Sequence, residues 1–498
     1  MSLPTTMGQP TLAPPESGVT VRMYNPGFGD CLLLAFAAED GAHYVLIDFG
    51  VHHSYPGQEE QSRKIALDIA QATGKHLHTV VVTHEHTDHL RGFKHAQDIL
   101  NEFEIDELWL AWTEDENNPT AKELKERYGL RARALVATIK QLQGFDDAFA
   151  QALQSVLEFE VPEALAATAT PSAEISFLRD KAKKAPRDPG DYRRPGKAPL
   201  CLPGVPDVQV YVLGPPEDLA SIRSLERKSE LYPEEEPVDE ETAFAAAVFA
   251  AGDGALPEEQ WLFDRSRPFD RSFEIPADQV RTDPAYAQFY KEHYGFADFS
   301  THGPAWRRID TDWLATAEHL ALKIDSKTNN TSLVLAFELT KTQPRKVLLF
   351  AADAQVANWL SWHTLSWPGE HKDDDPITAQ DLLQRTVLYK VGHHGSHNAT
   401  LKEKGLEMMD SPDLVAMLPV DQEWANEKQA WEHPDEHLYH RLIQRTKGRI
   451  MRTDEIPQGP QKPAKPAEAT EAEWATFTDQ LAWDDGPDQL WIQYTVPA

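Results

Sequence analysis

Runs of apolar residues, separated by short polar turns, organise the first hundred positions of the chain. Four of these runs are short and strongly apolar, and they predict β-strands at residues 19–24, 31–36, 43–47 and 79–82. Residues 62–73 instead carry apolar side chains at helical spacing and predict a helix. The pattern indicates an α/β arrangement in this part of the chain.

The same two patterns return later, on both sides of a long polar stretch. Further strands are predicted at 106–112, 208–213, 332–337, 346–350, 387–391, 414–419, 449–452 and 489–495. Further helices are predicted within 120–159 and at 173–184, 312–322, 355–362 and 434–446. We expect the last strand to lie at the edge of a sheet.

Shifts in composition suggest how the chain is divided. Residues 1–18 are dominated by Pro, Thr and Gly and predict a mobile tail. Residues 19–455 are expected to form one domain, interrupted by largely helical insertions at 115–205 and 217–318. Residues 456–498 are expected to be a linker rich in Pro, Ala and Lys and a C-terminal extension.

A dense polar cluster follows the strand predicted at 79–82. It contains His84, His86, Asp88 and His89. A helix is expected to begin within the cluster, with Asp88 and His89 on its first turn and the other two histidines on the loop before it. Four such groups would repel one another without a cation, and imidazole and carboxylate are ligands that zinc prefers. The alternative is a polar loop in a chain that has 20 histidines.

Three other predicted strands also end in groups that can bind a metal. Asp48 follows the third strand, Asp353 follows the strand at 346–350, and His393 and His394 follow the strand at 387–391. Four strand ends with the same chemistry are hard to explain without a shared site. For Asp48 taken by itself, a role in capping the turn is an equal alternative.

Composition and charge limit the possible partners. The formal net charge is −32 at pH 7, which disfavours non-specific binding to nucleic acid or anionic membranes. No apolar run is long enough for a membrane span, and the N-terminus does not resemble an export signal. Cys31 and Cys201 both lie beside apolar residues and are expected to be buried thiols, which fits the cytoplasm. The basic stretch 181–197 either attracts anions locally or is a solvated loop.

The unbroken pattern His-x-His-x-Asp-His at 84–89 resembles the hallmark of the metallo-β-lactamase superfamily. The surrounding sequence resembles, more narrowly, the lactamase-like domain of DNA-uptake competence proteins and their free-standing bacterial relatives. The segments that carry this second resemblance are GFGDC at 27–31, LIDFG at 46–50, NTSLV at 330–334, LLFAAD at 348–353 and KVGHHGS at 390–396.

The resemblance covers residues 19–112, 205–215 and 320–455. It implies a four-layer αββα sandwich with a pair of metal ions at one edge of its two sheets. His84 and His86 would hold one of these metals.

The remaining ligands are carried over in the same way. Asp88 and His89 would lie at the second metal with one of His393 and His394, of which we favour His394. Asp353 would bridge the two metals. The cofactor is therefore expected to be one or two divalent ions, Zn²⁺ or Mn²⁺.

Other residues would support the site or contact the substrate. Asp48 would orient the loop from behind the ligands. An additional histidine usual in the superfamily has no counterpart, and Asn330 lies in that region instead. An amide is a poorer ligand than imidazole, so one metal position is expected to be weaker or more open.

Such a site performs hydrolysis with a metal-activated water. Asp88 or Asp353 would orient the water, and His394, His393 or His397 would assist the leaving group. His397 has a surface position as its alternative.

The sequence thus predicts a cytoplasmic metallo-hydrolase that acts on a small molecule or a short oligonucleotide, with a phosphodiester as the expected bond. Hydrolysis of a lactone, thioester or other ester is the main alternative, and a non-catalytic metal-binding scaffold is the second. No stable binding of long duplex DNA and no membrane partner are expected.

Overall fold

A computed structural model describes residues 11–39, 41–126, 172–218, 282–294, 328–369, 375–428 and 431–498. Its contacts divide the chain into two units. The first unit comprises Met1–Lys125, Ala169–Lys228 and Ser326–Ala498. In the second unit the described helix is α11 (Pro284–Tyr294). Most of the helical region predicted within 120–159, and all of that at 312–322, lies outside the described residues.

One large sheet of the first unit is built mainly from the N-terminal part of the chain. Its strand order is β15-β16-β1-β2-β3-β4-β5. The bounds are β1 Gly18–Tyr24, β2 Cys31–Ala38, β3 Gly41–Phe49, β4 His76–Val81, β5 Glu104–Trp109, β15 Leu481–Trp483 and β16 Trp491–Pro497. The strands β3, β4 and β5 run parallel, and the other neighbours are antiparallel.

The other large sheet is built from the later strands. Its order is β14-β13-β12-β9-β8-β7-β6. The bounds are β6 Leu200–Leu202, β7 Val205–Gly214, β8 Val334–Leu339, β9 Lys346–Phe350, β12 Thr386–Lys390, β13 Val415–Leu418 and β14 Ile450–Arg452. The strands β9, β12, β13 and β14 are parallel to one another. A separate ribbon pairs β10 (Ser366–Trp367) with β11 (Ile377–Thr378).

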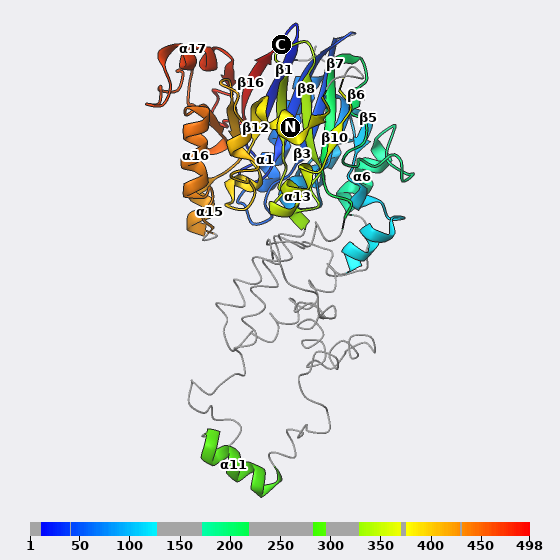
Figure 1. Cartoon of the computed structure of the whole chain (residues 1–498), viewed down its shortest axis with the longest axis vertical. Helices are drawn as coiled ribbons and strands as arrows, with labels where there is room; N and C mark the ends of the chain where they lie inside the picture. The colour runs from blue at the N-terminus through cyan, green and yellow to red at the C-terminus, as the bar shows by residue number, and fades with distance from the viewer. Residues whose placement is uncertain are drawn as a thin grey trace. The chain divides into compact units, whose positions relative to one another are not determined.

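Helices cover the outer faces of both sheets (Figure 1). Against the first sheet lie α1 Gln58–Thr73, α2 Thr87–His95, α3 Gln97–Leu100 and α6 Ala173–Lys181. Against the second sheet lie α13 Val356–Trp362, α14 Ala379–Gln384, α15 Gln422–Lys428 and α16 Glu436–Thr446. The remaining short elements are α17 Glu471–Asp479, η1 Trp112–Glu114, η6 His393–Gly395, η7 Leu406–Met408 and η8 Thr453–Glu455.

The alternation of side chains along the strands explains the four layers. In β2, Leu32 and Leu34 point between the sheets and pack in one core with Phe337 of β8. Their neighbour Leu33 points the other way, into the core beneath α1 with Ile65. Apolar residues on both faces of a strand require a cover on both sides, and each fully buried side chain of this size contributes about 1.5–3 kcal/mol. The predicted αββα sandwich is confirmed.

Both chain ends differ from the sequence prediction where they are described. Residues 11–17 are not a free tail, because the backbone N–H of Leu12 donates to Ala72 O (3.1 Å) and Tyr44 donates its hydroxyl to Leu12 O (2.8 Å). The last strand, β16, is not an edge strand, since it lies between β15 and β1. The preceding strand β15 pairs with β16 and supplies the outer edge, so both strands belong to the sheet.

Two lysines of the basic stretch 181–197 are paired with carboxylates of the sandwich, so the stretch matches neither of its two predicted descriptions fully. Lys183 pairs with Asp106 (2.8 Å) and Lys184 with Glu107 (2.9 Å), both on β5. These contacts place the end of the predicted 115–205 insertion in the sandwich unit. Cys31 is buried as expected, but Cys201 is exposed because β6 is the outermost strand of its sheet.

A buried histidine on β3 predicts an acid-sensitive step in stability. His43 is almost fully buried and stacks on His78 with ring centroids 4.5 Å apart. Burial, and then the neighbouring His78, lower the pKa of His43 from 6.5 to about 4. The folded state therefore favours neutral His43, so its contribution is present above pH 6.5 and is lost as the pH falls toward 4.

We expect protonation of His43 to account for up to about 3 kcal/mol of the decline in the free energy of unfolding through this window, so the decline should be smaller in His43→Gln. Denaturant titrations at pH 7, 5.5 and 4.5 measure the difference between the two proteins. An identical pH dependence in His43→Gln would contradict the assignment.

Candidate metal centre

The cluster at residues 83–89 lies where β4 ends and α2 begins. Thr87 is the first residue of α2, and His86 precedes it with extended backbone (φ −67°, ψ 152°). Asp88 occupies the first helical turn, where a negative charge is favoured by the exposed N–H groups of the helix. Because β3 and β4 are parallel, their carboxyl ends meet at one edge, which brings Asp48 beside this loop.

The second sheet delivers its ligand groups in the same way. The strands β9 and β12 are parallel neighbours, so the loops that follow them lie at the same edge. Asp353 lies three residues beyond β9, and His394 four residues beyond β12. His394 has a left-handed backbone (φ 51°), a conformation that costs energy and is often found at functional sites.

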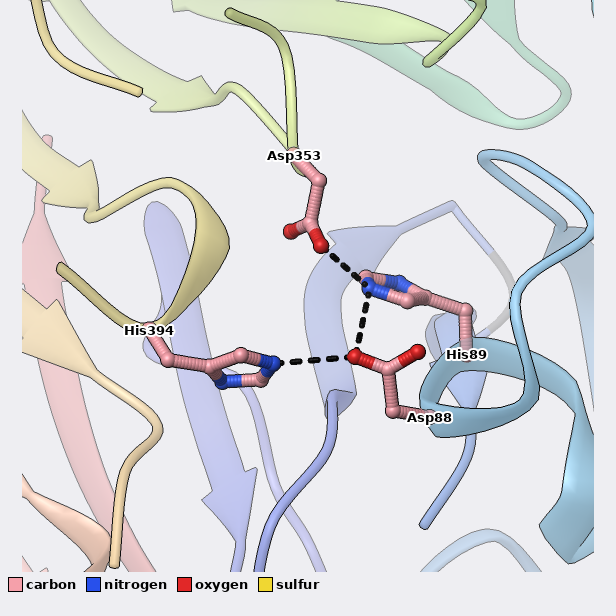
Figure 2. A group of neighbouring side chains, drawn as sticks. All are labelled: Asp88, His89, Asp353 and His394. Carbon is pink, nitrogen blue, oxygen red and sulfur yellow. Dashed lines mark hydrogen bonds and ion pairs between the residues drawn. The ribbon is translucent and has the colours of Figure 1, made fainter. Parts of the chain in front are cut away.

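Four side chains from the two sheets converge in Figure 2. His394 Nε2 lies 2.9 Å from Asp88 Oδ2, and His89 Nε2 lies 3.1 Å from Asp353 Oδ2. His89 Nε2 is also 3.6 Å from Asp88 Oδ2. All four side chains are fully buried, and one ligand atom from each lies within 4.8 Å of the others.

His84, His86 and Asp353 form an adjoining group. Their ligand atoms also lie within 4.8 Å of one another, and His84 Nε2 is 3.9 Å from Asp353 Oδ2. The rings of His84 and His86 are 4.5 Å apart, centre to centre. Asp353 therefore belongs to both groups. The division of these residues between two metals stays a prediction, with which the two groups are compatible.

The chemistry of these groups fits a pair of divalent cations. His84 Nε2 and Asp88 Oδ1 are buried and have no hydrogen-bond partner among the described residues. Buried polar atoms without partners cost about 1–3 kcal/mol each. His84 Nε2 would recover that cost as a metal ligand, and Asp88 Oδ1 would recover it by accepting a hydrogen bond from a water held at the metals. Within the described residues, the site fits the implied metals on its donor set and on its unpartnered atoms.

Hydrogen bonds behind the ligands set which ring nitrogen faces the site. His89 Nδ1 lies 2.7 Å from Asp48 Oδ2, and His394 Nδ1 lies 2.7 Å from Pro419 O. A carbonyl oxygen only accepts, so Nδ1 of His394 carries the proton and Nε2 offers a lone pair. Asp48 also accepts from Thr83 N (2.8 Å) and Thr83 Oγ1 (2.6 Å). Asp48 thus fixes both His89 and the start of the histidine loop.

Burial and charge shift the titration of the ligands strongly. Burial alone would lower the pKa of His89, but Asp353 and Asp88 raise it well above its usual value. Burial, with the charges of His89 and His86, lowers the pKa of His84 well below its usual value. Burial opposes ionisation of Asp353, yet His89 holds the pKa of that carboxyl well below its usual range. The site favours ionised carboxylates, which is the form that binds a cation.

The three residues predicted to contact the substrate or support the ligands, Asn330, His393 and His397, have different surroundings. Asn330 Oδ1 accepts from the backbone N–H of Asn358 (3.1 Å), so Asn330 anchors the start of α13. The backbone N–H of His393 donates to Asp353 Oδ1 (3.1 Å), while its ring packs against His433. His397 is exposed. Its predicted alternative, a surface position, describes it better.

Sequence reasoning missed two charged residues at the site. Lys390 is buried at the end of β12 and forms an ion pair with Asp30, which immediately precedes β2. Burial disfavours the charge on Lys390, but Asp30 and Asp353 raise its pKa above the usual value. The available signal was a lysine inside an otherwise apolar strand, because a buried lysine requires a partner.

The acidic segment after β5 supports the histidine loop through a partly buried ion-pair network. Lys125 Nζ lies 3.0 Å from Glu85 Oε1 and 2.8 Å from Glu114 Oε2. Glu114 is buried, and burial and then Glu85 raise its pKa to about 7. This network ties Glu85, which lies between two predicted ligands, to the sandwich.

Another histidine group, His76, His78 and Asp106, has ligand-like spacing at the other end of β4. It is poorly suited to a metal, because His78 Nδ1 already accepts from Tyr44 N (3.0 Å). Asp106 is also shared between His76 and Lys183, at 2.8 Å from each. These bonds are satisfied without a cation.

Aromatic side chains adjoin the metal centre on the side of His394. The ring of Phe28 lies 4.0 Å from that of His394, centre to centre. The ring centres of Trp424 and Trp431 lie 5.1 and 5.7 Å from that of Phe28, and the ring centre of His433 lies 6.1 Å from that of Trp431. Trp431 is only partly buried. We call Phe28, Trp424, Trp431 and His433 the aromatic wall.

Comparison with known proteins supports the superfamily but not a finer class. Residues 24–172 match the family model described as the metallo-beta-lactamase superfamily. No curated protein and no solved structure matched the chain. The narrower resemblance to competence proteins is therefore not confirmed. Among the described helices, none has the length and apolar character that a membrane crossing requires. With its histidine cluster in place at the edge of an αββα sandwich, the segment 24–172 belongs to the metallo-beta-lactamase superfamily.

Proposed function

We propose that the chain is a metal-dependent hydrolase that cleaves a phosphodiester in a nucleotide or a short oligonucleotide. The observation that carries the proposal is the position of Asp353, which is shared by the two ligand groups at the edge of the sandwich. A pair of divalent ions, Zn²⁺ or Mn²⁺, would supply an activated water and neutralise charge that develops on the phosphoryl oxygens. The long, negatively charged duplex is disfavoured by the net charge of −32.

Two residues of the ligand groups, Asp88 and His394, would have different roles in hydrolysis. Asp88 Oδ1 is buried and has no partner among the described residues, so it can accept a hydrogen bond from the attacking water and hold it in place. Nδ1 of His394 donates to Pro419 O, and Nε2 faces Asp88 Oδ2 within the four-residue ligand group. We therefore assign His394 to a ligand position rather than to protonation of the leaving group, which revises one role suggested by the sequence.

The aromatic wall favours a substrate with a planar group. Bases stack on aromatic side chains, and each stacking contact is worth about 1–3 kcal/mol. Trp431 is the member of the wall that remains partly exposed. A nucleotide whose phosphate lies between the ligand groups would have an aromatic surface within reach of its base.

A metal-supplemented screen decides the substrate class. The purified protein is assayed with Zn²⁺ or Mn²⁺ against bis-p-nitrophenyl phosphate, a dinucleotide, an acyl lactone and an acyl thioester. We expect hydrolysis of the two phosphodiesters. Activity confined to the lactone or thioester would contradict the proposed bond, and no activity on any of them would favour a metal-binding scaffold.

Substitution of the wall tests the nucleotide assignment. We expect Trp431→Ala to raise the KM for a dinucleotide about tenfold, as the loss of one stacked base predicts, with kcat changed by less than about threefold. Trp483→Ala on β15 is the matched control, because Trp483 is also partly buried but lies outside the wall. Equal KM values for the three proteins would show that the wall does not contact the base.

A further inference from the structure

A buried ion pair connects the two sheets directly behind the ligands. Lys390 ends β12 in the second sheet, and Asp30 precedes β2 in the first. Both side chains are only 1% exposed. The ammonium of Lys390 contacts Asp30 Oδ2 and donates to Ala352 O at 3.3 Å. The pair therefore spans the sandwich at the edge where the ligands lie.

Asp30 is fastened to the ligand loop of the first sheet. Its backbone N–H donates to Asp88 O (2.8 Å), and its carbonyl accepts from Gly50 N (2.9 Å). Its carboxylate Oδ2 lies 3.8 Å from His89 Nδ1. A displacement of Asp30 would consequently move the backbone of Asp88, whose side chain belongs to the four-residue ligand group.

Lys390 acts on the shared carboxylate from the second sheet. Its Nζ lies 3.7 Å from Asp353 Oδ1, the oxygen that also accepts from His393 N. The other oxygen, Oδ2, faces His89 Nε2 and His84 Nε2. The two oxygens of Asp353 thus have separate partners. Lys390 and the backbone N–H of His393 contact Oδ1, whereas the rings of His89 and His84 face Oδ2.

Stability alone is a weak explanation for this pair. Moving two charges out of water costs several kcal/mol per ion, and an apolar pair of the same volume is often as stable or more so. A fixed charge does, however, orient a neighbouring carboxylate, and misplacement of a reacting group by about 1 Å can cost about a hundredfold in rate. The contacts with Asp88 and Asp353 show where such orientation would act.

We propose that Lys390 and Asp30 are positioning residues that set the spacing between the ligands of the two sheets and turn Asp353 Oδ2 toward the metals. The inference rests on the proposed metal-dependent function. The Lys390–Asp30 ion pair connects the two sheets, and neither residue belongs to the histidine cluster at 84–89. The pair touches ligands and not the substrate, so its loss should change the metal geometry and kcat more than KM.

The test compares three variants loaded with Co²⁺, whose visible absorption reports ligand geometry. Asp30→Asn with Lys390→Met removes both charges without leaving either buried alone, and Lys390→Met removes only one. The control is Glu338→Gln with Arg385→Met, which removes a 2.5 Å ion pair whose carboxylate is fully buried and also contacts Arg345 (3.3 Å). The control pair contacts none of the residues in the ligand groups.

We expect the Asp30/Lys390 double variant to fold, to show altered Co²⁺ absorption bands and to lose about a hundredfold in kcat, with KM changed less than about threefold. The control should keep the wild-type spectrum and kcat. A double variant with wild-type spectrum and kcat would overturn the proposal. If the double variant does not fold, Lys390→Arg takes its place, because it keeps the charge and changes the position of the cationic group. Wild-type Co²⁺ absorption and kcat in that variant would likewise overturn the proposal.

The spectrum separates this inference from the proposed function. A wild-type protein that binds Co²⁺ but hydrolyses none of the screened substrates would contradict the hydrolase assignment. The altered or unaltered bands of the double variant would still decide whether the pair positions the ligands.

Discussion

Asp353→Ala is expected to abolish hydrolysis, with a loss of at least about a thousandfold in kcat/KM. The reason is that Asp353 is the residue common to both ligand groups, so its removal weakens both metal positions at once. His89 would also lose the carboxylate 3.1 Å from its Nε2. Steady-state hydrolysis of bis-p-nitrophenyl phosphate, with circular dichroism to check the fold, measures the effect.

The control for this variant is His440→Ala. His440 is an exposed histidine on α16. Its replacement tests whether activity falls when a titratable side chain outside the ligand groups is removed. We expect wild-type rates. A folded Asp353→Ala protein that retained more than a tenth of the wild-type activity would show that the shared carboxylate is not required for hydrolysis.

Deletion of residues 489–498 is expected to have the second large effect, on stability. The strand β16 pairs with β1 along its whole length and buries Ile492 and Val496 in the core between the sheets. These two side chains alone contribute about 3–6 kcal/mol, a large part of the 5–15 kcal/mol that holds a typical domain together. The deletion would also expose β1 as a long apolar edge.

We therefore expect the shortened chain to aggregate or to melt far below the wild-type protein. Ile492→Val is the graded control and should cost only about 0.5–1.5 kcal/mol. Thermal unfolding and size-exclusion chromatography compare the three proteins. A monomeric shortened chain with the wild-type midpoint would show that β16 does not support the sandwich.

The parts of the site that follow a local pattern were predictable from the sequence. The apolar run of β4 and the cluster after it indicated a strand that ends at a group of potential metal ligands, and the structure places such a group there. The strands before Asp48, Asp353 and His394 were visible for the same reason. Parallel neighbours then bring these ends together, which makes the grouping a consequence of topology.

The parts that depend on contacts distant in sequence were not predictable. Asp30 and Lys390 are 360 positions apart; a lysine in an apolar strand signals that it needs a partner, but no local pattern identifies Asp30 as that partner. The hydrogen bond from Asn358 N to Asn330 Oδ1 joins the loop before β8 to α13 and has no local signal either. The exposure of Cys201 depends on β6 being an edge strand, a property of the sheet and not of the residues around it.

The central claim, a metal pair held by the two ligand groups, is tested most directly by metal content. Elemental analysis of protein purified without chelator counts the ions per chain. We expect about one to two divalent ions per chain, with fewer in Asp353→Ala, because buried carboxylates and histidines at this spacing require a cation. A folded wild-type protein that contains no metal, and takes up none when Zn²⁺ or Mn²⁺ is supplied, would contradict the account.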